Sequence, residues 1–468
     1  MTVHPVALRR GLGLRSVVST STGLAFAAIE YLAAAGLVAY VAGPLAWVAI
    51  VTAGLFALLA WACFGELCGL FPTAAAIRLY LGRAFDDRVA LVVTFTYLST
   101  IVLVLATDAF IVGSAISHAL GASALVSAPI IALLLGIATV ANLRGTQVAA
   151  RVQDIATFAV IAVTLVVAVV AIAQDRGPRV ATQEHHGPMA FVQAVALGVL
   201  LYSAFEWVTT NAEEVDDQRD IGRGMLISLV ILGTTCSLVT VAMAHLLSRS
   251  ELASPYPQLF LGSHALGTFG FALMACVTGV TAINTFNSGF ITASRFVYAT
   301  AREGSLPAAF ARLNDNAVPY VPVYVLAGAS TVVAVVVALT GDFQVLLAVG
   351  ASLEAGIYAV AGACVLRLRR RLPAADRPFR MRGVPVLPWV AIVVFGFLSL
   401  TAALTVGDHA SVLPLLIILT LAAASSWYVL SVLPGMRTAA EAARAAAGTR
   451  RPRRPTVEQE EATRAGGS

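Results

Sequence analysis

The sequence predicts an all-α polytopic membrane protein with about twelve transmembrane helices. Of its 468 residues, 59% are hydrophobic and only 12% are charged, whereas a soluble domain carries about 25% charged residues. So little charge does not cover a water-exposed surface, and lipid is therefore the expected solvent for most of the chain. The apolar residues also fall into repeated runs of about 20, the length at which a helix crosses a bilayer.

The apolar runs divide the chain into three parts. Residues 1–16 are an expected cytoplasmic N-terminus, residues 17–433 a twelve-helix domain, and residues 434–468 a cytoplasmic tail, rich in Ala, Arg and Glu, that we expect to be partly disordered. Within the domain we place spans at 17–42, 45–68, 88–117, 125–142, 153–174, 190–211, 223–247, 266–294, 321–340, 343–366, 385–406 and 411–433.

The arginine distribution predicts the orientation of these spans. All 30 basic residues are arginine. With a cytoplasmic N-terminus, 27 of them fall in inner segments and 3 in outer ones, namely Arg176, Arg179 and Arg249. Because positive charge is retained on the cytoplasmic side, we expect a multi-pass protein of the plasma (inner) membrane with both termini inside. Arginines scattered among apolar spans do not form a nucleic-acid groove, so we expect no nucleic-acid partner.

The chain carries no motif for catalysis or for a bound cofactor. H-E-x-x-H, C-x-x-C and a Gly-rich phosphate loop before a basic residue are all absent from the sequence. The five cysteines lie in or at the ends of apolar runs, as small buried residues do. The pair His185–His186 has no further ligand at a recognisable spacing. We therefore expect neither an enzyme nor a resident metal or cofactor.

Four acidic residues lie well inside predicted spans: Glu30, Asp108, Glu206 and Glu354. A charge in the hydrocarbon is costly, and no arginine lies deep enough in a span to pair with these carboxyls simply. Each must therefore be protonated, hydrogen-bonded, hydrated or paired with a bound cation. Such residues favour a solute or proton pathway. A protonated carboxyl bonded to a neighbouring helix is the alternative, and the sequence leaves both open.

Two polar stretches predict places where a spanning helix is interrupted. At the start of the first span, the four hydroxyl residues of Ser19–Gly23 are poor helix formers. An interruption there would leave N–H groups and a positive helix end facing a cavity, which suits a carboxylate. A simple N-cap of the first helix explains the same residues. The sixth span is interrupted by Tyr202–Trp207, where an aromatic, a hydroxyl and an acid break an apolar run.

Corresponding interruptions in two halves of a chain indicate a transporter with a binding site near the bilayer midplane. The first and sixth spans are five apart, which is consistent with two five-span halves and two extra spans. We therefore predict a substrate site made of Ser21, Thr22, Gly23, Tyr202, Ser203, Ala204, Phe205 and Glu206. The carboxyls of Glu30, Asp108 and Glu354 are candidates for the substrate or proton pathway.

Several local motifs resemble the amino acid–polyamine–organocation transporters over roughly residues 15–435. Glu66–Pro72 is similar to the family's E-L-x-x-x-F-P after the second span. Phe205-Glu206, followed by Ala212–Val215, is similar to the sixth-span F-E and the A-E-E-V after it. The most diagnostic match is Ser294–Pro307, which resembles S-R-x-x-Y-A-x-A-R-D-G-x-x-P.

The resemblance implies a leucine-transporter-type fold, with two inverted five-helix repeats and two further helices. The repeats would cover about residues 17–174 and 190–366, and the extra helices about 385–433. It also implies a secondary transporter of the bacterial amino acid permease type, which moves an amino acid or related amine by alternating access around broken first and sixth helices. The expected partners are that small molecule and the lipid bilayer, with no indication of oligomeric state.

Two departures from the family pattern limit what the resemblance implies. Ser21-Thr22-Gly23 has one glycine fewer than the family's first-span G-x-G, and Val160 stands where some proton-coupled members carry lysine. Proton, sodium and exchange coupling therefore stay open, without a lysine proton site. The alternatives to amino acid transport are amine or polyamine exchange, a transport-like sensor, and a channel. A channel more naturally has a short re-entrant filter, which the sequence does not show.

Overall fold

The computed structural model describes residues 13–26, 30–73, 76–122, 126–145, 150–174, 187–407, 409–436 and 438. These residues are mostly helical, and two short strands, β1 (Thr405–Val406) and β2 (His409–Ala410), pair antiparallel. The α-helices are α1 (Leu14–Phe26), α2 (Glu30–Ala42), α3 (Ala46–Leu70), α4 (Ala76–Ala84), α5 (Asp87–Ala119), α6 (Ser127–Leu143), α7 (Ala150–Ala173), α8 (Pro188–Gly198), α9 (Gln218–Leu246), α10 (Arg249–Leu252), α11 (Pro257–Arg302), α12 (Tyr320–Thr340), α13 (Phe343–Arg371), α14 (Val386–Ala403) and α15 (Leu413–Trp427). Short 3-10 segments are η1 (Gly43–Leu45), η4 (Val199–Tyr202), η5 (Phe205–Asn211) and η6 (Ala308–Ala311), and η7 (Tyr428–Val432) is a π-helical turn.

The described residues include ten stretches long and apolar enough to cross a membrane, so the chain is a multi-pass membrane protein. The first stretch, Glu30–Leu70, holds two helices, α2 and α3, with η1 between them. Gly43 takes a positive φ of 52° there and Pro44 follows it, and both features end a regular helix. Each of the twelve predicted spans overlaps an observed helix. The number of twelve membrane crossings stays a prediction.

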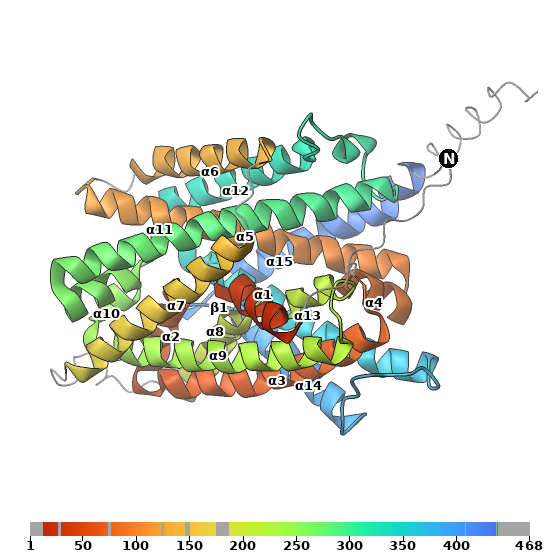
Figure 1. The fold of residues 1–468 in the computed structure, drawn as a ribbon, viewed down its shortest axis with the longest axis horizontal. Coiled ribbons are helices and arrows are strands. Elements are labelled where there is room, and N and C mark those ends of the chain that lie inside the picture. The colour runs from red at the N-terminus through yellow and green to blue at the C-terminus, as the bar shows by residue number, and fades with distance from the viewer. Residues whose placement is uncertain are drawn as a thin grey trace, which may run out of the picture.

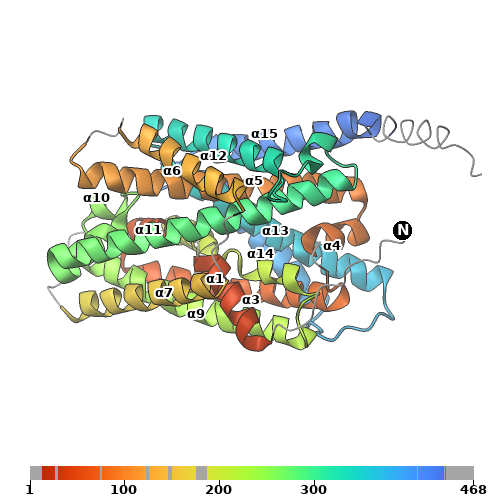
Figure 2. The same cartoon turned by 45° about the horizontal axis from the view of Figure 1, so that its top comes forward.

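The long helices lie along the longest axis of the molecule (Figure 1). In both views α3 and α9 lie side by side at one edge, and α6 and α12 at the opposite edge (Figures 1 and 2). The short helix α1 lies between these edges and contacts α7, α9 and η5. The first and sixth predicted spans therefore meet inside the bundle, as a site between them requires.

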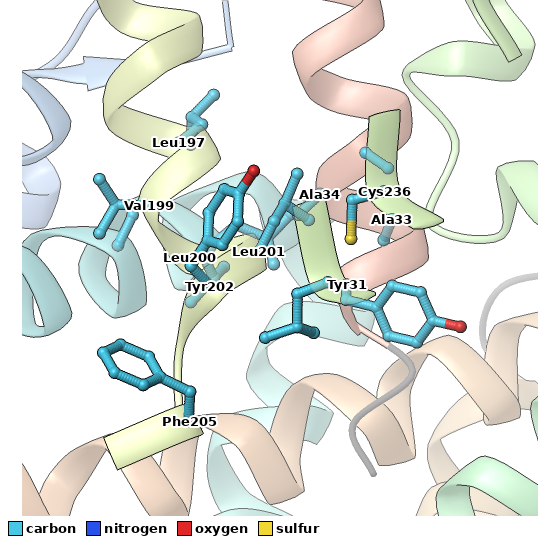
Figure 3. Packing of buried hydrophobic residues seen from close by; sticks show 14 of the residues in the cluster. Tyr31, Ala33, Ala34, Leu197, Val199, Leu200, Leu201, Tyr202, Phe205 and Cys236 are labelled. Carbon is cyan, nitrogen blue, oxygen red and sulfur yellow. The ribbon is translucent and has the colours of Figure 1, made fainter. Parts of the chain in front are cut away.

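Small residues let the helices around this centre approach closely. Ala33 and Ala34 of α2 are fully buried, and a Cβ on Gly36 would lie 2.7 Å from the Pro257 ring. Figure 3 shows the alanines of α2 beside Cys236 and the α8–η4 segment. Without a hydrophobic driving force between helices in lipid, such close backbone packing is a main source of association.

The interruption expected in the sixth span is confirmed. Helix α8 ends at Gly198, η4 continues to Tyr202, Ser203 is extended, and Ala204 takes the left-handed conformation with φ of 64°. The chain then resumes as η5. Figure 3 shows the ribbon leaving its helical path between Tyr202 and Phe205.

The expectation of an interrupted helix at Ser19–Gly23 was wrong, because α1 is helical from Leu14 to Phe26. Helix α2 begins at Glu30, and residues 27–29 lie outside the described residues. The physical reason lies in tertiary partners for the hydroxyl groups. Ser21 donates to the Phe205 carbonyl at 2.8 Å, and the Thr22 hydroxyl lies 2.6 Å from that of Ser228. Hydroxyls bonded across helices do not compete with the backbone of their own helix.

Two further differences concern segment bounds. Helix α4 lies between predicted spans, and α11 extends well beyond the predicted 266–294 at both ends, with a kink at Gly267. Most of the predicted tail, residues 434–468, lies outside the described residues.

Candidate functional site

The interrupted backbone at Ser203–Ala204 is the centre of the candidate site. The backbone makes 3-10 hydrogen bonds on either side of the interruption, from Ser203 N–H to Leu200 O at 3.1 Å and from Trp207 N–H to Ala204 O at 3.2 Å. A left-handed alanine costs about 1 kcal/mol or more. Irregular backbone at membrane depth is tolerated where it lines a cavity, and this segment does.

Two neighbouring cavities adjoin the interruption. One of about 90 Å³ is lined by Ser203 and Ala204, and one of about 100 Å³ by Glu206. Four residues line both cavities and form the wall they share: Tyr97, Ile101, Trp207 and Thr292. The larger cavity also reaches Ala76 and Ile77 of α4, a helix in the predicted inner segment. The pair of cavities therefore runs from the helix interruption toward the predicted cytoplasmic side.

Glu206 and Glu354 come together at these cavities from η5 and α13. The Tyr97 hydroxyl lies 3.1 Å from Glu206 Oε1 and 3.2 Å from Glu354 Oε2. Tyr358 donates from its hydroxyl to Glu206 Oε2 at 3.1 Å. Both carboxyls are at most 3% exposed. Within the described residues, neither carboxyl forms an ion pair with an arginine.

Counting hydrogen-bond donors restricts the protonation of this pair. The Tyr97 hydroxyl accepts from Trp207 Nε1 at 2.9 Å and has one proton, which it can donate to one carboxyl only. Its second lone pair can accept a proton held by the other carboxyl. The geometry therefore fits one ionised and one protonated carboxyl bridged by Tyr97. In addition, Glu354 Oε1 is buried without a hydrogen-bond partner, and Glu354 lines the smaller cavity.

Glu30 and Asp108 are joined by a different contact. Glu30 is the first residue of α2, and its backbone N–H donates to Asp108 Oδ1 at 3.1 Å. An N–H group in the first turn of a helix has no partner within that helix, and an anion there also complements the helix dipole. Glu30 lines the smaller cavity, whereas Asp108 is fully buried behind it and lines neither cavity. Asp108 thus positions α2 against α5.

The structure divides the predicted site residues into two groups. Ser203, Ala204, Glu206, Glu30 and Glu354 line the cavities. Ser21, Thr22, Gly23, Tyr202, Phe205 and Asp108 do not, and in α1 the lining residue is Ala25.

The second group holds the elements of the site together. Tyr202 points away from the cavities, between Gly54 and Gly233, and donates to Ile50 O at 3.0 Å. Phe205 accepts from Ser21 through its carbonyl, and its ring packs 5.9 Å from that of Tyr358.

Sequence reasoning missed the aromatic residues that complete the site, namely Tyr97, Trp207 and Tyr358. A signal for Tyr97 was available. Thr94, Thr96, Ser99 and Thr100 surround it and make a polar patch in the middle of an apolar helix. Such a patch in lipid indicates a cavity or a partner helix.

The described residues contain no group of three or more His, Cys, Asp or Glu side chains placed to hold a metal ion. The weak candidate pair His185–His186 lies outside the described residues. The central carboxyls contact tyrosine hydroxyls and one backbone amide.

Comparison with known proteins identifies the family. Residues 12–425 match the amino acid permease family. The chain belongs to that family. The chain is 26% identical over 223 residues to the gamma-aminobutyric acid permease of Escherichia coli (strain K12), covering 45% of this chain and 46% of that protein. It is 28% identical over 223 residues to the Asc-type amino acid transporter 1 of Mus musculus, covering 46% of this chain and 40% of that protein.

A further family relative is the branched-chain amino acid permease of Bacillus subtilis (strain 168), 25% identical over 221 residues and 46% of each protein. The chain spans about half the length, or less, of these curated relatives. Among solved structures, a manganese transporter of Eremococcus coleocola superposes with a TM-score of 0.58 at 14% identity, over 94% of this chain and 99% of that one. The fold is the predicted leucine-transporter type.

Proposed function

We propose that this protein is a secondary active transporter that moves an amino acid or a related amine across the plasma membrane by alternating access. The observation that carries the proposal is the interrupted sixth span, whose irregular backbone and two carboxyls line cavities in the middle of an amino acid permease fold. If the chain belonged to the permease family but had no such cavity, only its fold would be supported.

The chemistry of the cavities favours an ammonium group as the part of the substrate that is recognised. Glu30, Glu206 and Glu354 are the carboxyl groups that line them. An ammonium group placed beside these carboxyls would replace water as their partner, and Glu354 Oε1 is available to accept from it. Both an α-amino acid and a simple amine carry that group, which leaves the two substrate classes to experiment.

The Glu206–Tyr97–Glu354 bridge supports coupling to protons. One hydroxyl between two buried carboxyls accommodates one shared proton, and substrate ammonium binding would compete with that proton for the same oxygens. Val160 is a buried valine on α7, so the lysine site of some proton-coupled family members has no counterpart here.

We further propose that both termini are cytoplasmic and that the membrane is the plasma (inner) membrane. The support is the division of the arginines into 27 inner and 3 outer under that orientation. Cysteine introduced near either terminus should then react with impermeant maleimide only after the membrane is opened.

The test begins with a thermal-shift screen of the purified full chain against amino acids and amines, since a ligand of the native state raises apparent stability. The strongest ligand is then used for uptake into proteoliposomes under a pH gradient. We expect Glu206→Gln and Glu354→Gln each to lower initial uptake at least about tenfold, the loss that corresponds to 1.4 kcal/mol. Asp342→Asn, which neutralises an exposed carboxyl, is the matched control.

Three outcomes would overturn parts of the proposal. Full uptake by both glutamine variants would exclude the site. Uptake driven by a sodium gradient without a pH gradient would exclude proton coupling. If substrate crosses the membrane only when substrate is also present on the opposite side, so that counterflow is seen without net uptake, the protein is an exchanger.

A further inference from the structure

The inner end of α13 carries arginines that differ in what they contact. Arg369 and Arg377 both bind the carboxylate of Glu66. Arg371 donates to the carbonyls of Arg83 and Phe85, at 3.1 and 3.3 Å. Arg367 lies over the Phe85 ring, 4.7 Å from its centroid. Arg367, Arg370 and Arg371 have no carboxylate partner among the residues that the structure describes.

These three arginines line one cavity. Its volume is about 400 Å³, and its other walls include Phe85, Trp389 and Ile392. Arg367, Arg370 and Arg371 are all exposed, as is Trp389. The cavity is thus an open, positively charged pocket between the end of α13 and the start of α14. Its lining includes none of the residues of the Glu66 ion pairs, and it shares no lining residue with the substrate cavities.

The helix next to this pocket presents an apolar face to the surroundings. Val386, Val393 and Phe397 of α14 are 63%, 65% and 54% exposed. Their spacing of seven and four residues places them on one face of the helix. Trp389 lies near this face at the pocket, 53% exposed. An exposed apolar stripe on a spanning helix contacts acyl chains, and an exposed tryptophan at its end is typical of the headgroup level.

We propose that this pocket binds the phosphate of an anionic phospholipid from the surrounding leaflet. A lipid provides two groups that match this surface: an anion for three guanidinium groups that have no carboxylate partner among the described residues, and acyl chains for the apolar face of α14. Guanidinium groups bind phosphate oxygens in pairs of parallel hydrogen bonds, and basic pockets between helices on the cytoplasmic side suit anionic headgroups. A soluble phosphate compound would use the arginines but leave the apolar stripe without a role.

The matched variants come from the same inner loop. Arg367→Gln with Arg370→Gln removes two charges from the pocket and leaves Arg371, with its bonds to Arg83 and Phe85, in place. Arg380→Gln with Arg382→Gln removes two charges from exposed positions outside the pocket. A third variant, Arg367→Lys with Arg370→Lys, keeps the charge and loses the paired hydrogen bonds.

The experiment measures phosphatidylglycerol retained by the purified full chain in native mass spectrometry, with phosphatidylcholine as the uncharged comparison. We expect the Arg367/Arg370 glutamine variant to bind phosphatidylglycerol at least about tenfold more weakly, since two of the three guanidinium groups that face the phosphate are removed. The Arg380/Arg382 variant should stay within about twofold of the wild type. The lysine variant should fall between them. Equal weakening in both glutamine variants, or equal retention of phosphatidylcholine, would overturn the proposal.

A second arm separates a lipid from a free anion. Thermal stability is measured in phosphatidylcholine nanodiscs with inorganic phosphate added, and in nanodiscs that contain phosphatidylglycerol. We expect stabilisation by the lipid alone, lost in the Arg367/Arg370 glutamine variant. Equal stabilisation by inorganic phosphate would show that the pocket binds a soluble anion rather than a lipid, and it would overturn the assignment.

Discussion

Glu66 and Arg369 form a two-point ion pair between α3 and α13. Arg369 donates to the two carboxylate oxygens from Nε at 2.7 Å and from Nη2 at 2.5 Å. Glu66 is 2% exposed and also accepts from the Met381 backbone N–H at 2.9 Å. This carboxylate therefore joins the C-terminal ends of α3 and α13 to the loop that follows α13.

Glu66→Gln should lower the free energy of unfolding by about 3 to 5 kcal/mol, because it leaves the Arg369 guanidinium next to a buried site without its anion. Denaturant unfolding in detergent measures the change. Glu303→Gln is the control, since Glu303 pairs with Arg78 at a site where its side chain is 55% exposed, and exposed pairs contribute about 1 kcal/mol or less. Equal losses in the two variants would contradict the role given to burial.

Gly233→Ala should destabilise the protein by about 1 to 3 kcal/mol through overpacking. A Cβ at this position in α9 would lie 2.9 Å from the Tyr202 hydroxyl oxygen. Because that oxygen is the nearest obstacle, the same substitution should cost less in a Tyr202→Phe background. Gly136→Ala in α6, where nothing lies within 4 Å of the added Cβ, should cause no loss. A double-mutant cycle of thermal unfolding measures all three, and additive effects would exclude the contact.

Tyr97→Phe should lower proton-driven uptake by about tenfold to a hundredfold. The substitution keeps the ring but removes the hydroxyl that meets Glu206, Glu354 and Trp207, and hydrogen bonds to charged groups contribute about 1.5 to 3 kcal/mol each. The pH profile of uptake in proteoliposomes is the measurement, since loss of the bridge should also shift that profile. Tyr324→Phe, at a hydroxyl on a side chain 57% exposed, should behave as wild type. An unchanged pH profile of uptake in Tyr97→Phe would exclude a role for Tyr97 in proton coupling.

Acid should destabilise the segment around α10 through Glu251. Burial alone would raise the pKa of Glu251, but hydrogen bonds from Ser248 and from His264 hold it below its ordinary value. A carboxyl with a depressed folded pKa stabilises the protein above its unfolded pKa of about 4.3 and loses that contribution as pH falls through the folded pKa. The difference in unfolding temperature between wild type and Glu251→Gln should shrink as the pH falls below about 4.3.

Much of the fold was predictable because the solvent imposes it. Runs of about 20 apolar residues in a chain with few charges indicate spanning helices, and every predicted span overlaps an observed helix. Segments set by local detail were less predictable. Helix α4 is only 9 residues long and lies between spans, and α11 passes through Gly267, where a positive φ of 65° divides it. Neither feature changes the hydropathy on which span prediction depends.

The candidate site was predictable in part. Ser203–Glu206 combine a hydroxyl, a small residue, an aromatic and an acid in an apolar run, and the hydroxyl and the acid are the members that lipid disfavours. The same argument failed at Ser19–Gly23. Hydroxyl residues do not interrupt a helix when other helices satisfy them, and the partners of Ser21 and Thr22 are Phe205 and Ser228.

The sequence by itself determined that this chain lies in lipid, that its sixth span is interrupted, and that four carboxyls lie at membrane depth. Composition and local pattern carry that information, because each span meets lipid separately. Only the tertiary structure decided that Glu206 and Glu354 meet at the Tyr97 hydroxyl, while Asp108 is turned to the amide of Glu30. Which carboxyl finds which partner depends on how helices distant in the chain pack, and no local pattern contains that packing.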